Sequence, residues 1–154
     1  MSLRAQLTDA MKEAMKAKDA KRLATVRLML AALKDRDIAA RSETSRELLG
    51  DDEILTLLAK MIKQREESAL AFDTGNRPEL AAGEREEIAI IRSFMPAQMD
   101  EAAMKEAVKK VIAEVGAASI KDMGKVMAVL TERFAGQMDF SKASAATKDA
   151  LSGK

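Results

Sequence analysis

Lys121 and Lys125 have the type and spacing that best suit a chemical task in this chain. Residues four apart share one face of a helix, and here the two lysines flank Gly124. Lysine ammonium groups bind phosphate oxygens as point charges. A glycine inside a helix costs about 1 kcal/mol relative to alanine, so it needs a reason, either close packing between helices or close approach of a partner. The segment predicts a binding surface rather than a reaction centre.

The predicted surface extends along the last third of the chain. Ser119, three residues before Asp122 and an apolar run, is typical of a helix start. Gly136 would end that helix. Basic side chains at Arg133 and Lys142 would support the two lysines. The residues expected to contact a nucleic acid or another partner are Lys121, Gly124, Lys125, Arg133, Gly136 and Lys142.

Clustered carboxylates are the other residues whose chemistry needs an explanation. The acidic run 51–53 stands where a helix should begin, so we interpret it as helix capping rather than a magnesium site. Glu84 and Glu87 lie on adjacent turns of one helix, whereas Arg65 falls on the apolar side of another. An arginine on the core side must be paired. We therefore predict a structural ion pair between Arg65 and Glu84 or Glu87.

The composition excludes several kinds of site. Cysteine, histidine, tryptophan and tyrosine are absent, which removes thiol and imidazole nucleophiles and the usual zinc ligands. Neither the P-loop nor the dinucleotide-binding glycine pattern occurs. We therefore expect no catalytic residue, no metal ion and no cofactor. With no apolar run long enough to span a bilayer and no signal-peptide pattern, we expect a cytoplasmic protein with no membrane partner.

Charge is distributed unevenly along the 154 residues, although the net charge is only +1. Residues 1–50 hold eleven Lys and Arg against seven Asp and Glu, whereas residues 51–100 hold six against eleven. The densest basic segment runs from position 21 to position 41. Such a helix would dock phosphates, but a solvated helix face has the same pattern and is the interpretation we favour.

Helical periodicity covers nearly the whole chain, and strand patterns are almost missing. The first helix carries Leu3, Leu7, Met11 and Met15 at intervals of four, and Asp19 caps the second. Pro96 marks the likeliest boundary between domains. We predict an all-α fold with two lobes: a four-helix unit over residues 1–96 and a three-helix unit over residues 97–154. The expected helices span about 2–17, 20–41, 51–72, 78–95, 101–115, 120–134 and 140–151.

Four segments resemble the YqeY-like proteins, and the last third also resembles the tail domain of the B subunit of tRNA-dependent amidotransferase. The most specific of them runs from Lys121 to Met127 and is followed at the right distance by Gly136. The others are residues 27–34, residues 63–68 and the junction 94–99, in which an aromatic and an apolar residue precede Pro-Ala-Gln.

The resemblance implies binding rather than catalysis. In amidotransferases the tail domain helps to hold tRNA, while other parts perform the glutamine-dependent carbon–nitrogen ligase reaction. A shared domain does not transfer that reaction. Our leading expectation is a noncatalytic module that engages tRNA or an aminoacyl-tRNA enzyme. The alternatives are a protein–protein adaptor, and a component of a carbon–nitrogen ligase with glutamine as amido-N-donor whose chemistry a partner supplies.

Overall fold

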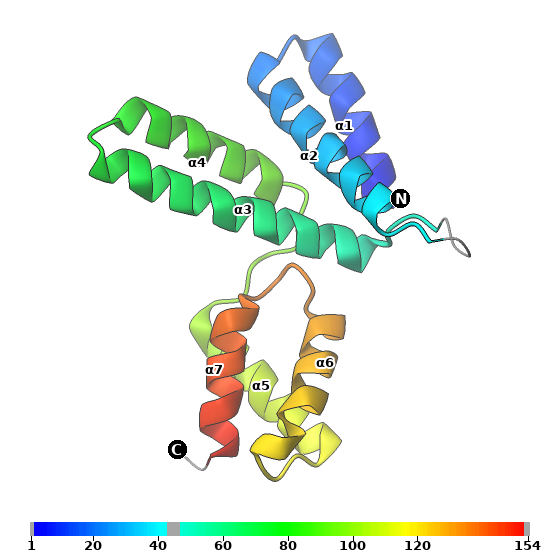
Figure 1. The fold of residues 1–154 in the computed structure, drawn as a ribbon, viewed down its shortest axis with the longest axis vertical. Coiled ribbons are helices and arrows are strands. Elements are labelled where there is room, and N and C mark those ends of the chain that lie inside the picture. Colours follow the sequence, from blue (N-terminus) through cyan, green and yellow to red (C-terminus); the bar gives the residue numbers. More distant parts are fainter. Residues whose placement is uncertain (1, 43–46, 153–154) are drawn as a thin grey trace. The chain divides into compact units, whose positions relative to one another are not determined.

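The fold is all-helical, as the periodicity predicted. A computed structural model of the chain describes residues 2–42 and 47–152. Over these residues it contains seven α-helices and one short 3₁₀ helix, and no β-strand. The helices are α1 (Leu3–Ala17), α2 (Ala20–Ala39), α3 (Asp51–Thr74), α4 (Pro78–Arg92), α5 (Glu101–Val115), η1 (Ile120–Asp122), α6 (Met123–Arg133) and α7 (Phe140–Leu151) (Figure 1).

The helices form two compact units, Met1–Met95 and Pro96–Lys154. In the first unit α1 and α2 form one antiparallel hairpin, α3 and α4 form another, and α2 contacts all three of the other helices. In the second unit α5, α6 and α7 each contact the other two (Figure 1).

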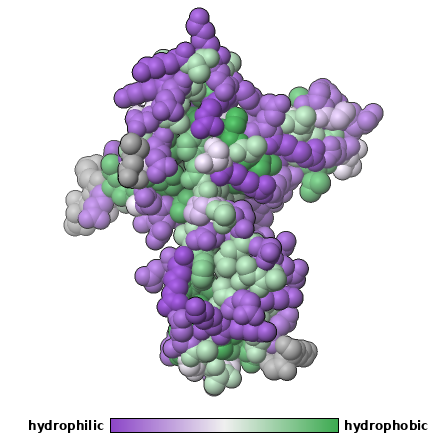
Figure 2. All heavy atoms as spheres, turned by 180° about the vertical axis from the view of Figure 1, so that it is seen from behind, coloured by the Kyte–Doolittle hydropathy of each residue, from purple (hydrophilic) through white to green (hydrophobic). Residues whose placement is uncertain are grey.

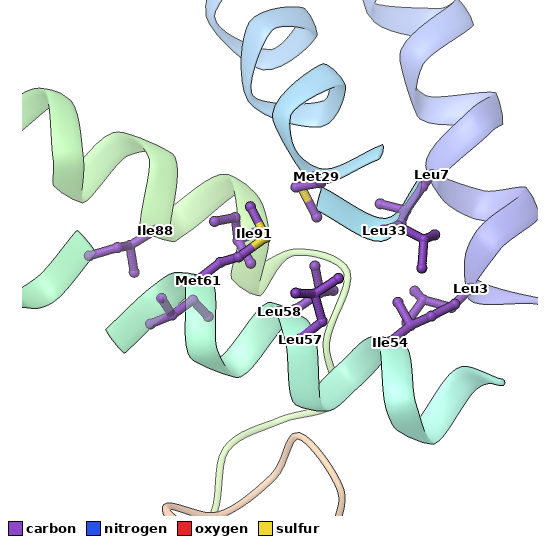
Figure 3. Close-up of a cluster of buried hydrophobic side chains, with 11 residues drawn as sticks. Leu3, Leu7, Met29, Leu33, Ile54, Leu57, Leu58, Met61, Ile88 and Ile91 are labelled. Atoms are coloured by element: carbon purple, nitrogen blue, oxygen red, sulfur yellow. The ribbon is translucent and has the colours of Figure 1, made fainter. Parts of the chain in front are cut away.

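The core of the first unit draws side chains from all four of its helices (Figure 3). Leu7 from α1, Met29 and Leu33 from α2, Leu58 from α3 and Ile91 from α4 are almost completely buried. Burying such a side chain stabilises the fold by about 1.5–3 kcal/mol. Hydrophilic side chains cover most of the outer surface on the face that Figure 2 shows, so the amphipathic pattern of the sequence separates core from solvent.

Helix α1 forms as the interval-of-four pattern predicted, but its buried face departs from that pattern in the second half of the helix. Leu3, Leu7, Ala10 and Ala14 are buried, but Met15 is 51% exposed. Intervals of four advance about 40° further around the helix at each step, because one turn takes 3.6 residues. The methionines therefore rotate away from the core, and the small alanines at intervals of three and four replace them.

Two helix ends also differ from prediction. Helix α4 ends at Arg92, short of Pro96, and Phe94 folds back against the first unit's core with the Arg22 guanidinium 5.0 Å from its ring centroid. At α3 the N-cap is Gly50 and makes no side-chain cap. The Asp51 carboxylate instead accepts the Leu3 amide, with Oδ1 3.1 Å from the nitrogen. The carboxylates at this helix start therefore include one that caps α1.

The second unit has a smaller core, centred on Val108, Val111, Val126 and Leu130. Asp100 caps α5 by accepting the Ala103 amide at 2.7 Å, and Gly116 ends the helix with φ +68°. Both features follow the sequence prediction, since aspartate at an N-cap and glycine at a left-handed C-cap position are the common choices. Asp100 fixes where α5 begins, and Gly116 fixes where the chain leaves it toward α6.

Candidate functional site

The start of α6 is built by a turn that the Asp122 carboxylate holds together. Its Oδ2 accepts the backbone amide of Ala118 at 2.9 Å and that of Ser119 at 3.4 Å. These hydrogen bonds lower the pKa of Asp122 below its ordinary value, and the nearby positive charge of Lys125 contributes. The pattern recognised in the sequence is therefore a helix start, but it begins with the 3₁₀ turn η1 rather than directly with α6.

Lys121 and Lys125 are both exposed at this helix start. Neither ammonium group forms an ion pair with any residue that the structure describes. Cations at a helix N-terminus meet the positive end of the helix dipole, and like charges four residues apart repel each other. The two lysines thus oppose the helix dipole, and the Asp122 carboxylate near Lys125 offsets part of this effect.

Gly124 is exposed and has open space where a side chain would begin. A Cβ atom built on it would meet no heavy atom within 4 Å. The prediction that Gly124 permits close packing between helices of this unit is therefore wrong. Because Gly124 is the second residue of α6, it also lies at the helix start and not inside the helix as the sequence pattern suggested.

Ile120 contributes an apolar side chain to this exposed helix start. From the sequence, Ile120 was interpreted only as the first residue of the helix. It is 48% exposed and precedes Lys121 directly. Its exposure follows from its place at the first position of η1, before the segment turns into the core. We define the α6-start surface as Ile120, Lys121, Gly124 and Lys125.

The other predicted binding residues do not join this surface. Lys125 and Arg133 are eight residues apart on α6, about 12 Å along its axis. Arg133 at the far end forms an ion pair with Glu114 of α5. Lys142 is exposed in the first turn of α7, which follows that same far end of α6. The structure therefore divides the predicted set between the two ends of one helix.

Gly136 belongs to the framework of the second unit. It is buried and has φ +75°, a conformation that favours glycine. Its carbonyl accepts a hydrogen bond from the side-chain amide of Gln98, while the Met99 amide donates to the Gln137 carbonyl at 2.8 Å. These bonds tie the segment before α5 to the turn between α6 and α7. They give structural roles to Gly136 and to the glutamine of the 94–99 junction.

Arg65 lies where the sequence placed it, on the inner side of α3. Its side chain is 15% exposed, and its Nε atom lies 2.9 Å from Oε2 of Glu87 on α4. Lys21 of α2 approaches the other oxygen of Glu87 at 3.6 Å, a contact that no sequence pattern indicated. Glu84, the alternative partner, takes part in none of the ion pairs between described residues. The cluster connects three helices of the first unit.

The first unit contains a second charged cluster, which no sequence pattern predicted. The guanidinium of Arg4 on α1 donates two hydrogen bonds to Asp37 on α2, at 2.8 and 3.0 Å. The same Asp37 carboxylate accepts the Leu49 amide at 3.0 Å, and Arg4 donates to the Leu49 carbonyl at 3.2 Å. The hydrogen bonds from Arg4 lower the pKa of Asp37, with a further contribution from the Leu49 amide. The cluster joins two helix ends to the segment before α3.

The described residues hold neither a metal-binding cluster nor a membrane-spanning helix. No group of three or more Asp and Glu side chains there is placed to hold a metal ion. None of the helices in residues 2–42 and 47–152 is long and apolar enough to cross a membrane.

These features define a class: an all-helical protein of two compact units, with charged clusters joining helices of the first and two unpaired lysines at a helix start in the second. The chain belongs to the YqeY-like family, because the family described as "Yqey-like protein" matches residues 4–151. The match includes both units.

Related fungal proteins match a shorter part of the chain. One is "Altered inheritance of mitochondria protein 41, mitochondrial" of Saccharomyces cerevisiae (strain YJM789), 33% identical over 85 residues, which cover 55% of this chain and 44% of that protein. The protein of the same name from Lachancea thermotolerans is 35% identical over 91 residues, covering 59% of this chain and 46% of that protein. The matched regions thus span less than half the length of these curated relatives.

Proposed function

We propose that this protein is a noncatalytic binding module that engages tRNA, or an aminoacyl-tRNA enzyme, through the α6-start surface. The observation that carries the proposal is the pair of exposed lysines at a helix N-terminus, neither of which forms an ion pair among the described residues, although the Asp122 carboxylate lies near Lys125. Phosphate groups are the anions that such an arrangement suits, since lysine and the helix start both attract negative charge.

The open space at Gly124 supports the same proposal. Because no neighbouring atom lies within 4 Å of a Cβ built there, the backbone of the first α6 turn is accessible between the two lysines. A phosphate backbone would approach it closely, with the exposed Ile120 packing against sugar or base surfaces. The scarcity of aromatic residues argues against recognition by base stacking, so we expect binding with little sequence preference.

Two alternatives remain proposals of lower rank. An adaptor that binds another protein would use the same surface, with Ile120 as its apolar contact. A role beside a glutamine-dependent carbon–nitrogen ligase would require a partner to supply the reacting groups, since this chain has neither histidine nor cysteine. Our proposal includes a cytoplasmic setting; the word "mitochondrial" belongs to the names of the fungal relatives.

The test is a fluorescence titration of labelled total tRNA with the purified chain between about 50 and 200 mM salt, where phosphate-dominated binding loses most of its affinity. The variant is Lys121→Gln/Lys125→Gln. We expect weaker binding and a salt slope smaller by about two, because each lost phosphate contact lowers the slope by about one.

The matched control is Lys12→Gln/Lys16→Gln. These exposed lysines also stand four residues apart, on α1, and the control removes the same charge. Equal affinity and slope for both double variants would overturn the assignment of the surface. Binding that responds to Lys121 and Lys125 but hardly to salt would instead support the adaptor.

A further inference from the structure

The arginines of this chain differ sharply in how they are partnered. Among the described residues, six arginines form ion pairs with carboxylates, Arg22 lies over the Phe94 ring, and Arg41 acts on the carboxylate of Asp37. Arg27 and Arg36 pair with no carboxylate of the described residues, and both lie on α2. Lys34 on the same helix is likewise without an ion pair there.

Arg27 and Lys34 lie on one stripe of α2. Seven residues are close to two helical turns, so the two side chains point in nearly the same direction, about 10.5 Å apart along the axis. The stripe faces away from the core, because Val26, Met29 and Leu33 occupy the opposite side of the helix. All members of the stripe are exposed. We define the α2 stripe as Ala24, Arg27, Ala31, Lys34 and Ile38.

Small residues keep the α2 stripe accessible between its charges. Ala24 and Ala31 lie on either side of Arg27, so a flat or curved surface can approach the helix while Arg27 and Lys34 reach out to it. Asp35 is the exposed carboxylate nearest the stripe in sequence, and it takes part in none of the ion pairs between described residues. The stripe therefore presents two positive charges to solvent, with one carboxylate beside Lys34 in the sequence.

From this arrangement we infer that the α2 stripe is a second binding surface, for the phosphate backbone of RNA. The inference rests on the proposed function for the identity of the polyanion. Arginine binds phosphate in a fork geometry and lysine as a point charge, and contacts of both kinds position a protein without reading sequence. The solvated-face interpretation of this helix makes the opposite prediction, that Arg27 and Lys34 contribute nothing to RNA binding.

An anionic membrane fits the α2 stripe less well than RNA does. Membrane-surface helices bury a broad apolar face with the basic residues around it. The exposed large apolar residues of α2 are only Leu28 and Ile38, each 47% exposed, and the centre of the stripe is alanine. RNA requires no such apolar face, because its affinity comes from neutralising phosphates.

The test uses the full chain with the double variant Arg27→Gln/Lys34→Gln in the tRNA titration. We expect affinity to fall on the order of tenfold near 50 mM salt, and the salt slope to decrease by about two. The control is Lys60→Gln/Lys63→Gln, which removes the same charge from an exposed face of α3 in the same unit. Thermal unfolding of each variant, followed by circular dichroism, shows that the fold is kept.

The inference is overturned if the α2 and α3 double variants bind tRNA equally well. It is also overturned if Arg27→Gln/Lys34→Gln loses binding to vesicles of anionic phospholipid while keeping its tRNA affinity. Failure of the α6-start surface is a separate result: there Lys121→Gln/Lys125→Gln binds like the unmodified chain, whereas the α2 variant is weakened. A chain that binds no tRNA at low salt contradicts both proposals.

Discussion

The two compact units of this protein use their charges differently. In the first unit, ion pairs join α1 to α2, α2 to α4 and α3 to α4, and two of these clusters are largely buried. In the described part of the second unit, one ion pair joins two helices, Arg133 with Glu114. Both side chains of this pair are about half exposed. The second unit is held instead by a small apolar core and by backbone caps.

This difference explains where charges are left for binding. A charge paired across two helices contributes to the fold and is unavailable to a ligand. The second unit keeps Lys121 and Lys125 in solvent at a helix start, and the first unit keeps Arg27 and Lys34 on the outer stripe of α2. Under the proposed function, stability and binding therefore depend on different residues, and substitutions should separate them.

The largest effect should come from the second unit's core. Leu130 is completely buried between α5, α6 and α7, and Leu130→Ala should lower the free energy of unfolding by about 3 kcal/mol. Hydrogen exchange measured by mass spectrometry should rise in peptides from residues 101–151. Leu70→Ala is the control, because Leu70 is 64% exposed. A Leu130→Ala variant as stable as this control would contradict an apolar basis for the second unit.

Asp37→Asn should produce the largest electrostatic effect in the first unit. The substitution leaves the Arg4 guanidinium without its carboxylate and weakens the bond from the Leu49 amide. Since Arg4 is partly solvated, we expect a loss of about 2–3 kcal/mol rather than the larger cost of a completely buried pair. Chemical denaturation followed by circular dichroism measures it. Asp35→Asn, two residues away and exposed, should change stability by less than about 0.5 kcal/mol.

Acid should abolish the difference between Asp37→Asn and the unmodified chain. The pKa of Asp37 is lowered in the folded state from its ordinary value of 3.8, by its hydrogen bonds with Arg4 and Leu49. Its contribution to stability is therefore complete above the unfolded-state pKa and is lost as the pH falls through the lower, folded-state pKa. Melting temperatures of the two proteins should differ most near about pH 7 and should approach each other as the pH falls below the ordinary carboxyl pKa of 3.8. A constant difference would show that the charge of Asp37 is unimportant.

A matched pair of arginines sharpens the comparison between units. Arg65 is 15% exposed and bonded to Glu87, whereas Arg133 is 49% exposed and bonded to Glu114. Arg65→Gln should cost about 1–2 kcal/mol, because it leaves Glu87 with only the more distant Lys21. Arg133→Gln should cost less than about 1 kcal/mol, as exposed pairs do. If both substitutions lowered the denaturant midpoint equally, the burial of an ion pair would not decide how much it stabilises its unit.

Local features of the fold were predictable from the sequence, whereas tertiary pairings mostly were not. Asp100, Gly116 and Pro78 mark helix ends because their preferences act within one turn. Arg65 was predictable as a paired residue, since its place on the apolar side of α3 demanded a partner. Arg4 and Asp37 are 33 residues apart, and no periodicity connects them.

The candidate site was predictable only in part for a related reason. The spacing of Lys121 and Lys125 placed them on one side of a helix start, and the structure exposes both. Arg133 and Lys142 were grouped with these lysines because they are near them in the sequence. In the structure, Arg133 lies at the opposite end of α6 from Lys125. Whether a charge is already paired depends on which helix packs beside it, as the pairing of Arg133 with Glu114 demonstrates.

The smallest effect compares one glycine from each unit. Gly124 begins α6 in open space, and Gly83 lies inside α4, where a Cβ would meet only the Lys21 ammonium at 3.9 Å. Neither has a positive φ. Alanine at each position should therefore raise stability, by about 0.5 kcal/mol at Gly124 and up to about 1 kcal/mol at Gly83.

Binding separates the two substitutions where stability does not. If a phosphate backbone approaches the first turn of α6, the added methyl of Gly124→Ala should lower tRNA affinity although the protein is slightly more stable. Gly83→Ala should leave affinity unchanged, because α4 contributes to neither proposed surface. Affinity unchanged in both variants would leave the lysines as the binding groups and remove Gly124 from the interface. A lower melting temperature for Gly124→Ala would contradict the open space that the structure assigns to it.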